Sequence, residues 1–251
     1  MKRKLFPITV SLCCAVLALG AIAWIYGEGW IRFNYVSANL YPVQGIDISH
    51  HQGQIDWRQA AGTPNLTFAI IKESEGGDFR DSDFEKNWKE AGEAGLIRGA
   101  YHFFSFCRPG DIQARNYLGA AQLSPESFPA IIDLEFGGNC NRRLTPAELS
   151  AELTSFMNEI AKTDTRKPIF YMTPEFRDAY LQDGIANFPA HHLWIRSIFF
   201  APPSKPCVDW AMWQYAHNGR INGISSLVDL NVFCGKKDML PSYLGIRSGN
   251  S

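Results

Sequence analysis

From residue 44 onward, short strand-like apolar segments alternate with segments of helical pattern, and this alternation constrains the fold more than any other feature. It is typical of a parallel sheet whose strands are joined by right-handed crossovers. The clearest helix start is Thr145-Pro146-Ala147-Glu148, a capping box with proline at the first helical position. Eight strands are predicted, enough to close a TIM-like α/β barrel. They cover residues 45–49, 66–73, 97–104, 129–135, 168–171, 192–195, 210–215 and 227–233, with helices over 83–94, 110–121, 145–163 and 174–181.

Two acidic residues interrupt the apolar strand predicted over residues 129–135. Asp133 and Glu135 are two positions apart, so their side chains leave the strand on the same face, roughly 6–7 Å apart. Two carboxyl groups at a buried strand end are costly unless they have a use. Crowding moves their pKa values apart, which gives one acid and one ionised partner. Such a pair is the smallest set of catalytic groups with which most glycosidases cleave a glycosidic bond.

Two further acids lie on strands that the barrel prediction brings near this pair. Asp47 is near the end of the first predicted strand, and Asp229 is within the eighth. Barrels of this type carry their active site at the carboxyl ends of the strands. The first and eighth strands are neighbours in a closed barrel, and the fourth lies across its mouth. We therefore expect Asp47, Asp133, Glu135 and Asp229 to converge on one cleft.

The first 26 residues have the pattern of an export segment. Lys2, Arg3 and Lys4 precede an uncharged run from Leu5 to Tyr26. As a helix this run would rise about 33 Å, enough to cross a bilayer. The positive-inside rule then places the rest of the chain across the membrane from the cytoplasm. We divide the chain into a transmembrane signal anchor or signal peptide (1–26), a linker (27–43) and a barrel domain (44–251).

Two interpretations of the export segment stay open. An uncleaved anchor is favoured by its length and by Trp24, Tyr26 and Trp30, which resemble an interfacial aromatic belt. A cleaved signal is favoured by the small residues at positions 21 and 23, a signal-peptidase pattern. The expected location is the inner membrane with the domain in the periplasm or outside, or secretion if the signal is cleaved.

Four of the six cysteines fall in predicted loops of the exported domain, where disulfides are stable. Four cysteines permit three pairings. We favour Cys107–Cys140 and Cys207–Cys234, because each pair would sit on neighbouring strand ends.

The remaining composition excludes other classes of function. The net charge is −1 and no long basic stretch occurs, so nucleic acid is not expected as a partner. Neither a Cys-x-x-Cys motif nor a histidine cluster with zinc spacing is present, so we expect no metal and no cofactor. His50 and His51 are interpreted as supporting or surface residues rather than ligands.

Six short motifs in order resemble those of glycoside hydrolase family 25, the exported lysozymes that cut bacterial cell-wall glycan. Each motif is weak alone, but the six together, from residue 45 to about 233, are specific. They are Gly45-Ile46-Asp47-Ile48-Ser49-His50, Phe68-Ala69-Ile70-Ile71-Lys72 with Ser74-Glu75-Gly76, Arg98-Gly99-Ala100-Tyr101-His102-Phe103, Asp133-Leu134-Glu135, Trp213-Gln214-Tyr215 and Val228-Asp229-Leu230-Asn231. The resemblance implies an eight-stranded barrel with about five helices.

The resemblance also implies roles for the four acids. Glu135 matches the general acid that protonates the leaving oxygen. Asp133 matches the carboxylate that stabilises the positively charged transition state, directly or by orienting the substrate's 2-acetamido group. Asp47 and Asp229 match supporting acids of the cleft, one of which helps to position water. Other residues are implied to line the cleft and bind substrate: Lys72, Glu75, Phe103, Tyr171 and Gln214.

The activity implied is hydrolysis of the β-1,4 bond between N-acetylmuramic acid and N-acetylglucosamine in peptidoglycan strands, by a monomeric enzyme. The chain departs from the family pattern at His51, Glu73 and Arg196, and in the loop 137–141. These departures concern substrate preference more than catalysis, since all four acids are kept. Two alternatives stay open: a chitinase-like glycosidase, and a non-catalytic module that binds cell-wall glycan on the same fold.

Overall fold

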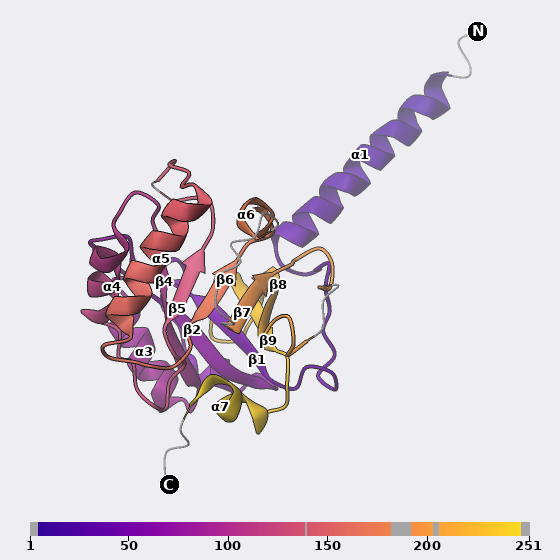
Figure 1. The fold of residues 1–251 in the computed structure, drawn as a ribbon. Coiled ribbons are helices and arrows are strands. Elements are labelled where there is room, and N and C mark those ends of the chain that lie inside the picture. Colours follow the sequence, from indigo (N-terminus) through magenta and orange to yellow (C-terminus); the bar gives the residue numbers. More distant parts are fainter. Residues whose placement is uncertain (1–4, 139, 182–191, 203–205, 247–251) are drawn as a thin grey trace.

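The computed structural model describes residues 5–138, 140–181, 192–202 and 206–246. An eight-stranded barrel forms the body, and the helix α1 (Leu5–Gly27) extends away from it (Figure 1). The ring runs β1-β9-β8-β7-β6-β5-β4-β2, and pairing of β1 with β2 closes it, which confirms the predicted barrel. Its strands are β1 (Gln44–Ile48), β2 (Leu66–Glu75), β4 (Ile97–Phe103), β5 (Ile131–Leu134), β6 (Ile169–Met172), β7 (His192–Arg196), β8 (Met212–Gly219) and β9 (Val228–Phe233).

The helices include all four that the sequence predicts, with small shifts at their ends. They are α3 (Phe84–Glu93), α4 (Gly110–Leu118), α5 (Pro146–Ile160) and α6 (Pro174–Tyr180). The predicted capping box starts α5, where the Glu148 amide donates to Thr145 Oγ1 and the Thr145 amide donates to Glu148 Oε2 at 2.7 Å.

Four short elements are additional to the prediction: α2 (Trp57–Ala61), α7 (Met239–Leu244), the 3-10 turn η1 (His50–Gln52) and the strand β3 (Phe79–Arg80), which pairs with the end of β2. Apart from α1, the described part of the chain thus has six α-helices, close to the five or so expected for the barrel. Elements this short have no visible period in the sequence.

The last strand corrects the expectation of a wholly parallel sheet. The pairings from β1 through β2, β4, β5, β6 and β7 to β8 are parallel, but β9 runs antiparallel to both β8 and β1. Only the short segment 220–227 joins β8 to β9, too little chain for a helical crossover. As a result the beginning of β9, not its end, lies at the carboxyl ends of the parallel strands.

The two faces of each strand pack into different layers. On β5, Ile131 belongs to the apolar cluster inside the barrel, whereas Ile132 and Leu134 pack in the layer that includes residues of α3, α4 and α5. On β1 the inward position is Gly45, where an added Cβ would lie 2.1 Å from the Phe68 ring. The filled interior forms a floor, and the inward positions just beyond it carry the polar groups of the site.

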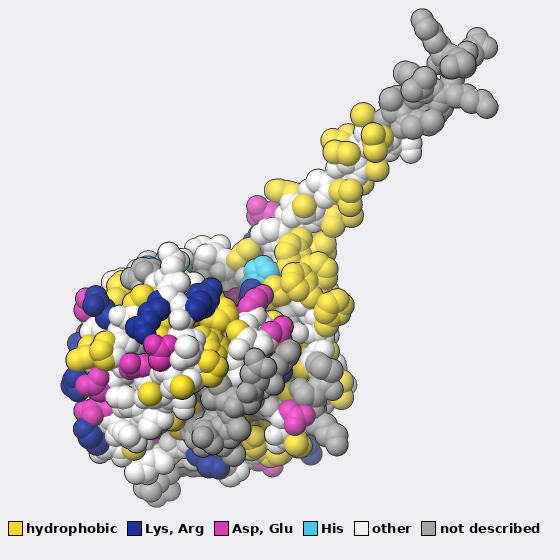
Figure 2. All heavy atoms as spheres, turned by 45° about the horizontal axis from the view of Figure 1, so that its top comes forward, with side chains coloured by type: hydrophobic (Ala, Val, Ile, Leu, Met, Phe, Trp, Pro, Cys, Tyr) yellow, Lys and Arg dark blue, Asp and Glu magenta, His cyan; other side chains and the backbone are white. Residues whose placement is uncertain are grey.

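The helix α1 does not support the expectation of a membrane-spanning segment. Over the residues that the structure describes, no helix is both long and apolar enough to cross a bilayer. Its described apolar side chains are nevertheless exposed, for example Leu12, Leu17 and Leu19. Figure 2 shows hydrophobic side chains along α1 and gathered where α1 meets the barrel.

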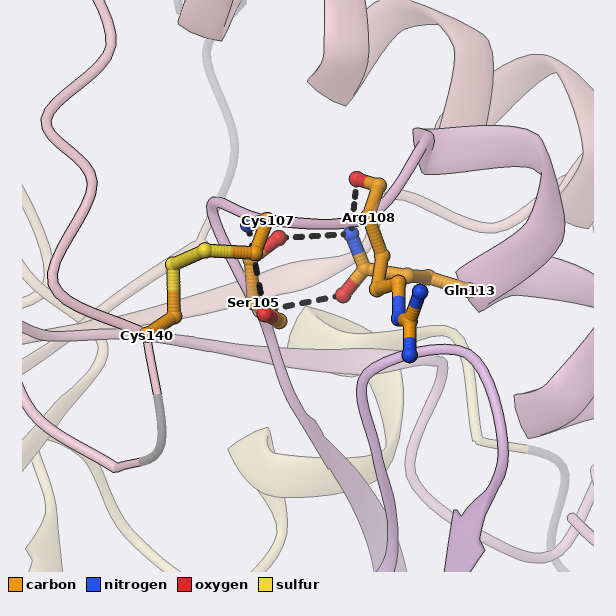
Figure 3. Close-up of a disulfide and its surroundings, with 5 residues drawn as sticks. All are labelled: Ser105, Cys107, Arg108, Gln113 and Cys140. Atoms are coloured by element: carbon orange, nitrogen blue, oxygen red, sulfur yellow. Dashed lines mark hydrogen bonds between the residues drawn. A yellow bond between two sulfur atoms is a disulfide. The ribbon is translucent and has the colours of Figure 1, made fainter.

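Both favoured disulfides are present. Cys107–Cys140 joins the loop after β4 to the loop after β5, and Cys207–Cys234 joins the β7–β8 connection to the residue after β9. The first is shown in Figure 3, where the Gln113 amide supports its loop by donating to the Ser105 and Arg108 carbonyls, each at 2.9 Å. This disulfide fixes the chain that leaves β5, and therefore the surroundings of Glu135.

Candidate active site

A cleft of about 440 Å³ opens at the carboxyl ends of the parallel strands, a volume in the ordinary range of ligand sites. All four predicted acids line it, as do Lys72, Phe103, Tyr171 and Gln214 of the predicted substrate-binding set. The remaining lining residues are Ser49, His51, Tyr101, Trp194, Arg196 and His217.

Asp47 is the most firmly held of the four acids. Its Oδ2 accepts hydrogen bonds from Gln214 Nε2 at 3.0 Å and from Asn231 Nδ2 at 2.6 Å. Each amide is oriented by an aromatic donor on its oxygen: the Tyr171 hydroxyl on Gln214 at 2.9 Å, and the Trp194 indole on Asn231 at 2.8 Å. Two fixed donors favour the ionised form of Asp47, although burial is the larger effect and raises its pKa.

Asp229 is the direct partner of Asp47 across the β1–β9 pairing. Burial, the charge of Asp47 and a hydrogen bond with Asp47 raise the pKa of Asp229 well above its usual value. The same hydrogen bond lowers the pKa of Asp47. Since two amide donors already point at Asp47, the negative charge of the pair is favoured on Asp47 and the proton on Asp229.

Asp133 and Glu135 stand on the opposite side of the cleft, at the end of β5. Asp133 is 9% exposed, and its Oδ1 has no hydrogen-bond partner in the described structure. Burial, followed by the charges of Glu135 and Asp47, raises its pKa well above the usual value. Glu135 is half-buried, and burial raises its pKa while the charge of Arg196 opposes the rise. No ion pair engages Glu135 among the described residues.

Lys72 and Glu75 form a neutral unit at the cleft edge. Lys72 Nζ lies 2.8 Å from Glu75 Oε2, 5.0 Å from the centre of the Phe103 ring and 5.4 Å from that of Phe79. Lys72 and Phe103 line the cleft, whereas Glu75 does not and acts through Lys72. Glu75 thus contacts the cleft only through its ion pair with Lys72.

The cleft contains residues that the sequence analysis did not select as site residues. Trp194 and Asn231 fix Asp47, and His217 and Arg196 form part of the wall. A usable signal existed for Asn231, which lies two positions after Asp229 and so shares its strand face. His51 lines the cleft, whereas His50 is held by Asp81, with Nδ1 2.7 Å from Oδ2.

Two other kinds of catalytic centre find no support in the described structure. Ser74 Oγ lies 2.7 Å from His102 Nδ1, but both residues are fully buried, and burial lowers the pKa of His102 to about 4. A buried serine cannot reach a substrate, so this pair is structural. Nowhere in the described ranges do three or more His, Cys, Asp or Glu side chains gather in a way that could hold a metal ion.

Comparisons with known proteins agree with this geometry. The family model "Glycosyl hydrolases family 25" matches residues 46–224. A protein of Escherichia coli named YegX is 33% identical over 261 residues, covering 93% of each chain. Lysozyme M1 of Streptomyces globisporus is 31% identical over 210 residues, covering 79% of this chain and 70% of that protein. A family 25 glycosyl hydrolase structure from Bacillus anthracis superposes with a TM-score of 0.76 at 32% identity, covering 85% of this chain and 98% of that one.

Proposed function

This chain belongs to the glycosyl hydrolases of family 25 and is a peptidoglycan-cleaving lysozyme, and we propose that the four acids of the cleft carry out its reaction. The bond cleaved is the β-1,4 linkage between N-acetylmuramic acid and N-acetylglucosamine. The observation that carries the proposal is the state of Glu135: its pKa is raised, it is reachable from the cleft, and no described cation pairs with it. A carboxyl group in that state can donate a proton to a glycosidic oxygen.

The other acids have complementary tasks. Glu135 donates its proton to the leaving oxygen as the bond to the anomeric carbon breaks, and positive charge develops on the sugar ring. Asp133 faces the same cleft, and its raised pKa favours the protonated form before substrate binds. It orients the 2-acetamido group by a hydrogen bond, or it stabilises the charge directly once the developing positive charge on the sugar has lowered its pKa. The ionised Asp47, held by Gln214 and Asn231, accepts a proton from the attacking water. Asp229 keeps the proton that holds Asp47 in place.

The residues around the acids bind the sugar rings. Tyr101 and Phe103 are partly exposed and supply aromatic surface in the cleft, whereas the buried Tyr171 and Trp194 hold the polar groups beneath it. Lys72 is held by Glu75 and presents its ammonium group at the cleft edge, where hydroxyl and acetamido oxygens of a sugar can accept hydrogen bonds.

The test is release of new reducing ends from purified peptidoglycan by the full-length protein. Glu135→Gln is expected to lower kcat by roughly 10²–10⁴-fold while leaving folding and glycan binding intact. Glu93→Gln is the matched control, because Glu93 is exposed on α3 and its Lys89 contact is a surface pair. Activity on chitin alone would favour the chitinase-like alternative, and binding without turnover would favour the non-catalytic module.

We further propose that the domain is exported, with residues 1–26 as the signal. Support comes from the two disulfides, which are stable in oxidising compartments and rare in the cytosol. Whether the segment is then cleaved or retained as an anchor is decided by the mass of the mature N-terminus and by extraction of membranes with carbonate. Reduced cysteines and an intact N-terminus in the cytosolic fraction would contradict export.

A further inference from the structure

Arg196 stands in the active-site cleft without a partner. It is the last residue of β7, two positions after Trp194 and therefore on the same face of the strand. Within the described structure, its guanidinium makes no hydrogen bond and no ion pair within 4.0 Å. Its charge is nevertheless close enough to oppose the rise that burial causes in the pKa values of Asp47, Glu135 and Asp229.

The cleft acids do not require Arg196 as a structural partner. Asp47 is already satisfied by Gln214 and Asn231, and Asp229 by its hydrogen bond to Asp47. The other cation of the cleft, Lys72, is occupied by Glu75. Arg196 is therefore the cation of the described cleft wall whose hydrogen-bond donors are free for a ligand. A guanidinium fork matches a carboxylate in a bidentate manner.

Chain from outside the family-matched region packs against the wall beside Arg196. The Tyr26 ring packs edge-on against His217 at 5.8 Å, and Asn218 Nδ2 donates to the Tyr26 carbonyl at 2.8 Å. Asn34 Nδ2 also donates to the Ser197 carbonyl at 3.1 Å, directly after Arg196. Burial and the charge of Arg196 both lower the pKa of His217, so at neutral pH His217 adds no second cation. Residues 26–34 thus support the part of the wall formed by His217 and Arg196, which carries one permanent positive charge.

We propose that Arg196 binds a carboxylate carried by the glycan strand and makes the enzyme select strands with an acidic substituent near the scissile bond over uncharged amino-sugar polymers. This inference rests on the proposed function. Two sources can supply the group: the lactyl carboxylate of a muramic acid residue without its peptide, or a carboxylate of an attached peptide. Approach of an anion to a cleft that contains the ionised Asp47 is otherwise opposed by its charge, and Arg196 offsets that repulsion.

The test compares matched soluble substrates with the full-length protein. One arm uses peptide-free strands with free or amidated lactyl groups, and the other uses strands whose peptides have free or amidated carboxylates. The wild-type ratio of kcat/KM for acid over amide is expected to be about 10–100 in the arm that holds the true source, as for a hydrogen bond to a charged group. Arg196→Gln is expected to bring this ratio close to 1, mainly through KM, and Arg196→Lys to keep part of it.

The ratio of kcat/KM for acid over amide strands separates carboxylate binding by Arg196 from the effect of its charge on the pKa values of the catalytic acids. Loss of its charge alters the pKa of Glu135 for every substrate alike, so it changes both rates but not their ratio. An unchanged ratio in Arg196→Gln, or a wild-type ratio near 1 in both arms, would overturn the proposal. Arg115→Gln is the control, since Arg115 pairs with Asp111 on an exposed face of α4.

Failure of the proposed function gives a different result. In that case the wild type cleaves no strand, and the role of Arg196 is tested by measuring strand affinity with calorimetry. Glu135→Gln is then compared with Glu135→Gln/Arg196→Gln on the acid and amide strands. If the single and the double variant bind the acid strand with equal affinity, Arg196 does not bind a carboxylate. Circular dichroism and thermal melting verify that each variant is folded.

Discussion

Asp47 and Asp229 face each other across the antiparallel strands β1 and β9, and a hydrogen bond between their side chains adds to the rise that burial causes in the pKa of Asp229 and opposes the rise in the pKa of Asp47. The pairing depends on the reversed direction of β9, which brings the second residue of that strand to the cleft. Because two amide donors point at Asp47 and favour charge there, the two acids are not equivalent, although the sequence alone presents them alike.

This asymmetry predicts different effects of neutralising each acid. Asp229→Asn keeps a group that can donate to Asp47, so we expect kcat to fall less than about tenfold. Asp47→Asn removes the ionised acceptor and is expected to lower kcat by at least about 10²-fold. Steady-state kinetics on soluble peptidoglycan fragments measures both. Equal losses would show that Asp229 is itself an ionised participant.

The orientation of Gln214 is predicted to matter for catalysis. Tyr171→Phe removes the hydroxyl that fixes the Gln214 amide, so Asp47 loses an oriented donor. We expect kcat to fall about tenfold, with a stability loss of about 1–3 kcal/mol from the unpaired amide oxygen. Tyr180→Phe is the matched control, since its buried hydroxyl donates to the Leu144 carbonyl and touches no cleft residue. If kcat falls as much in Tyr180→Phe as in Tyr171→Phe, the cause is a general packing effect.

The pH profile of activity is predicted to move when Arg196 is neutralised. Glu135 must be protonated to act, so activity falls as pH rises through its raised pKa. The Arg196 charge holds that pKa down, and its removal in Arg196→Gln therefore raises it. We expect the alkaline limb of the kcat profile to shift to higher pH. A shift in the opposite direction would mean that another group controls this limb.

A second pH dependence is predicted for stability, from a carboxyl group outside the cleft. Glu73 on β2 is fully buried, both its oxygens lack partners among the described residues, and burial raises its pKa to about 7. Its folded pKa lies above the unfolded value, so its favourable contribution is complete below about pH 4.5 and is lost as pH rises through 7.

Glu73→Gln tests this contribution because it keeps the shape and removes the ionisation. We expect the variant to be more stable than wild type at pH 8, by up to about 3 kcal/mol, and similar to wild type near pH 4.5. Urea unfolding at the two pH values measures the difference. Glu93→Gln, at an exposed position, is expected to show no such pH-dependent gain. A variant that loses stability equally at both pH values would contradict the prediction.

The Cys107–Cys140 disulfide is predicted to support both stability and the site. Its partners are 33 residues apart, and replacing both with Ser is expected to cost about 3–4 kcal/mol on the loop-entropy estimate. Since the bridge fixes the chain directly after Glu135, we also expect a lower kcat. The Cys207→Ser/Cys234→Ser variant, with partners 27 residues apart, is the comparison. If both variants lose stability and neither loses kcat, the Cys107–Cys140 disulfide supports the fold but not catalysis.

Much of the barrel was predictable because its signals are local. Each strand is a short apolar run, and each long helix has a start signal such as Thr145 with Glu148. The direction of β9 was not predictable in this way, because an apolar run reads the same in both directions. The short elements α2, α7 and β3 were missed since they are too brief for a period.

The active site also has features that local sequence signals predict and features that they do not. The sequence by itself determined which acids the cleft would contain, because Asp and Glu on apolar strands have few structural uses and so are conspicuous. It could not assign their protonation, place Arg196 and Trp194 in the cleft, or reveal the contact of Tyr26 with His217. Those features depend on which side chains face each other across strands and from the N-terminal segment. Burial, hydrogen bonding and charge at such contacts arise only when distant parts of the chain meet, so the tertiary structure decided them.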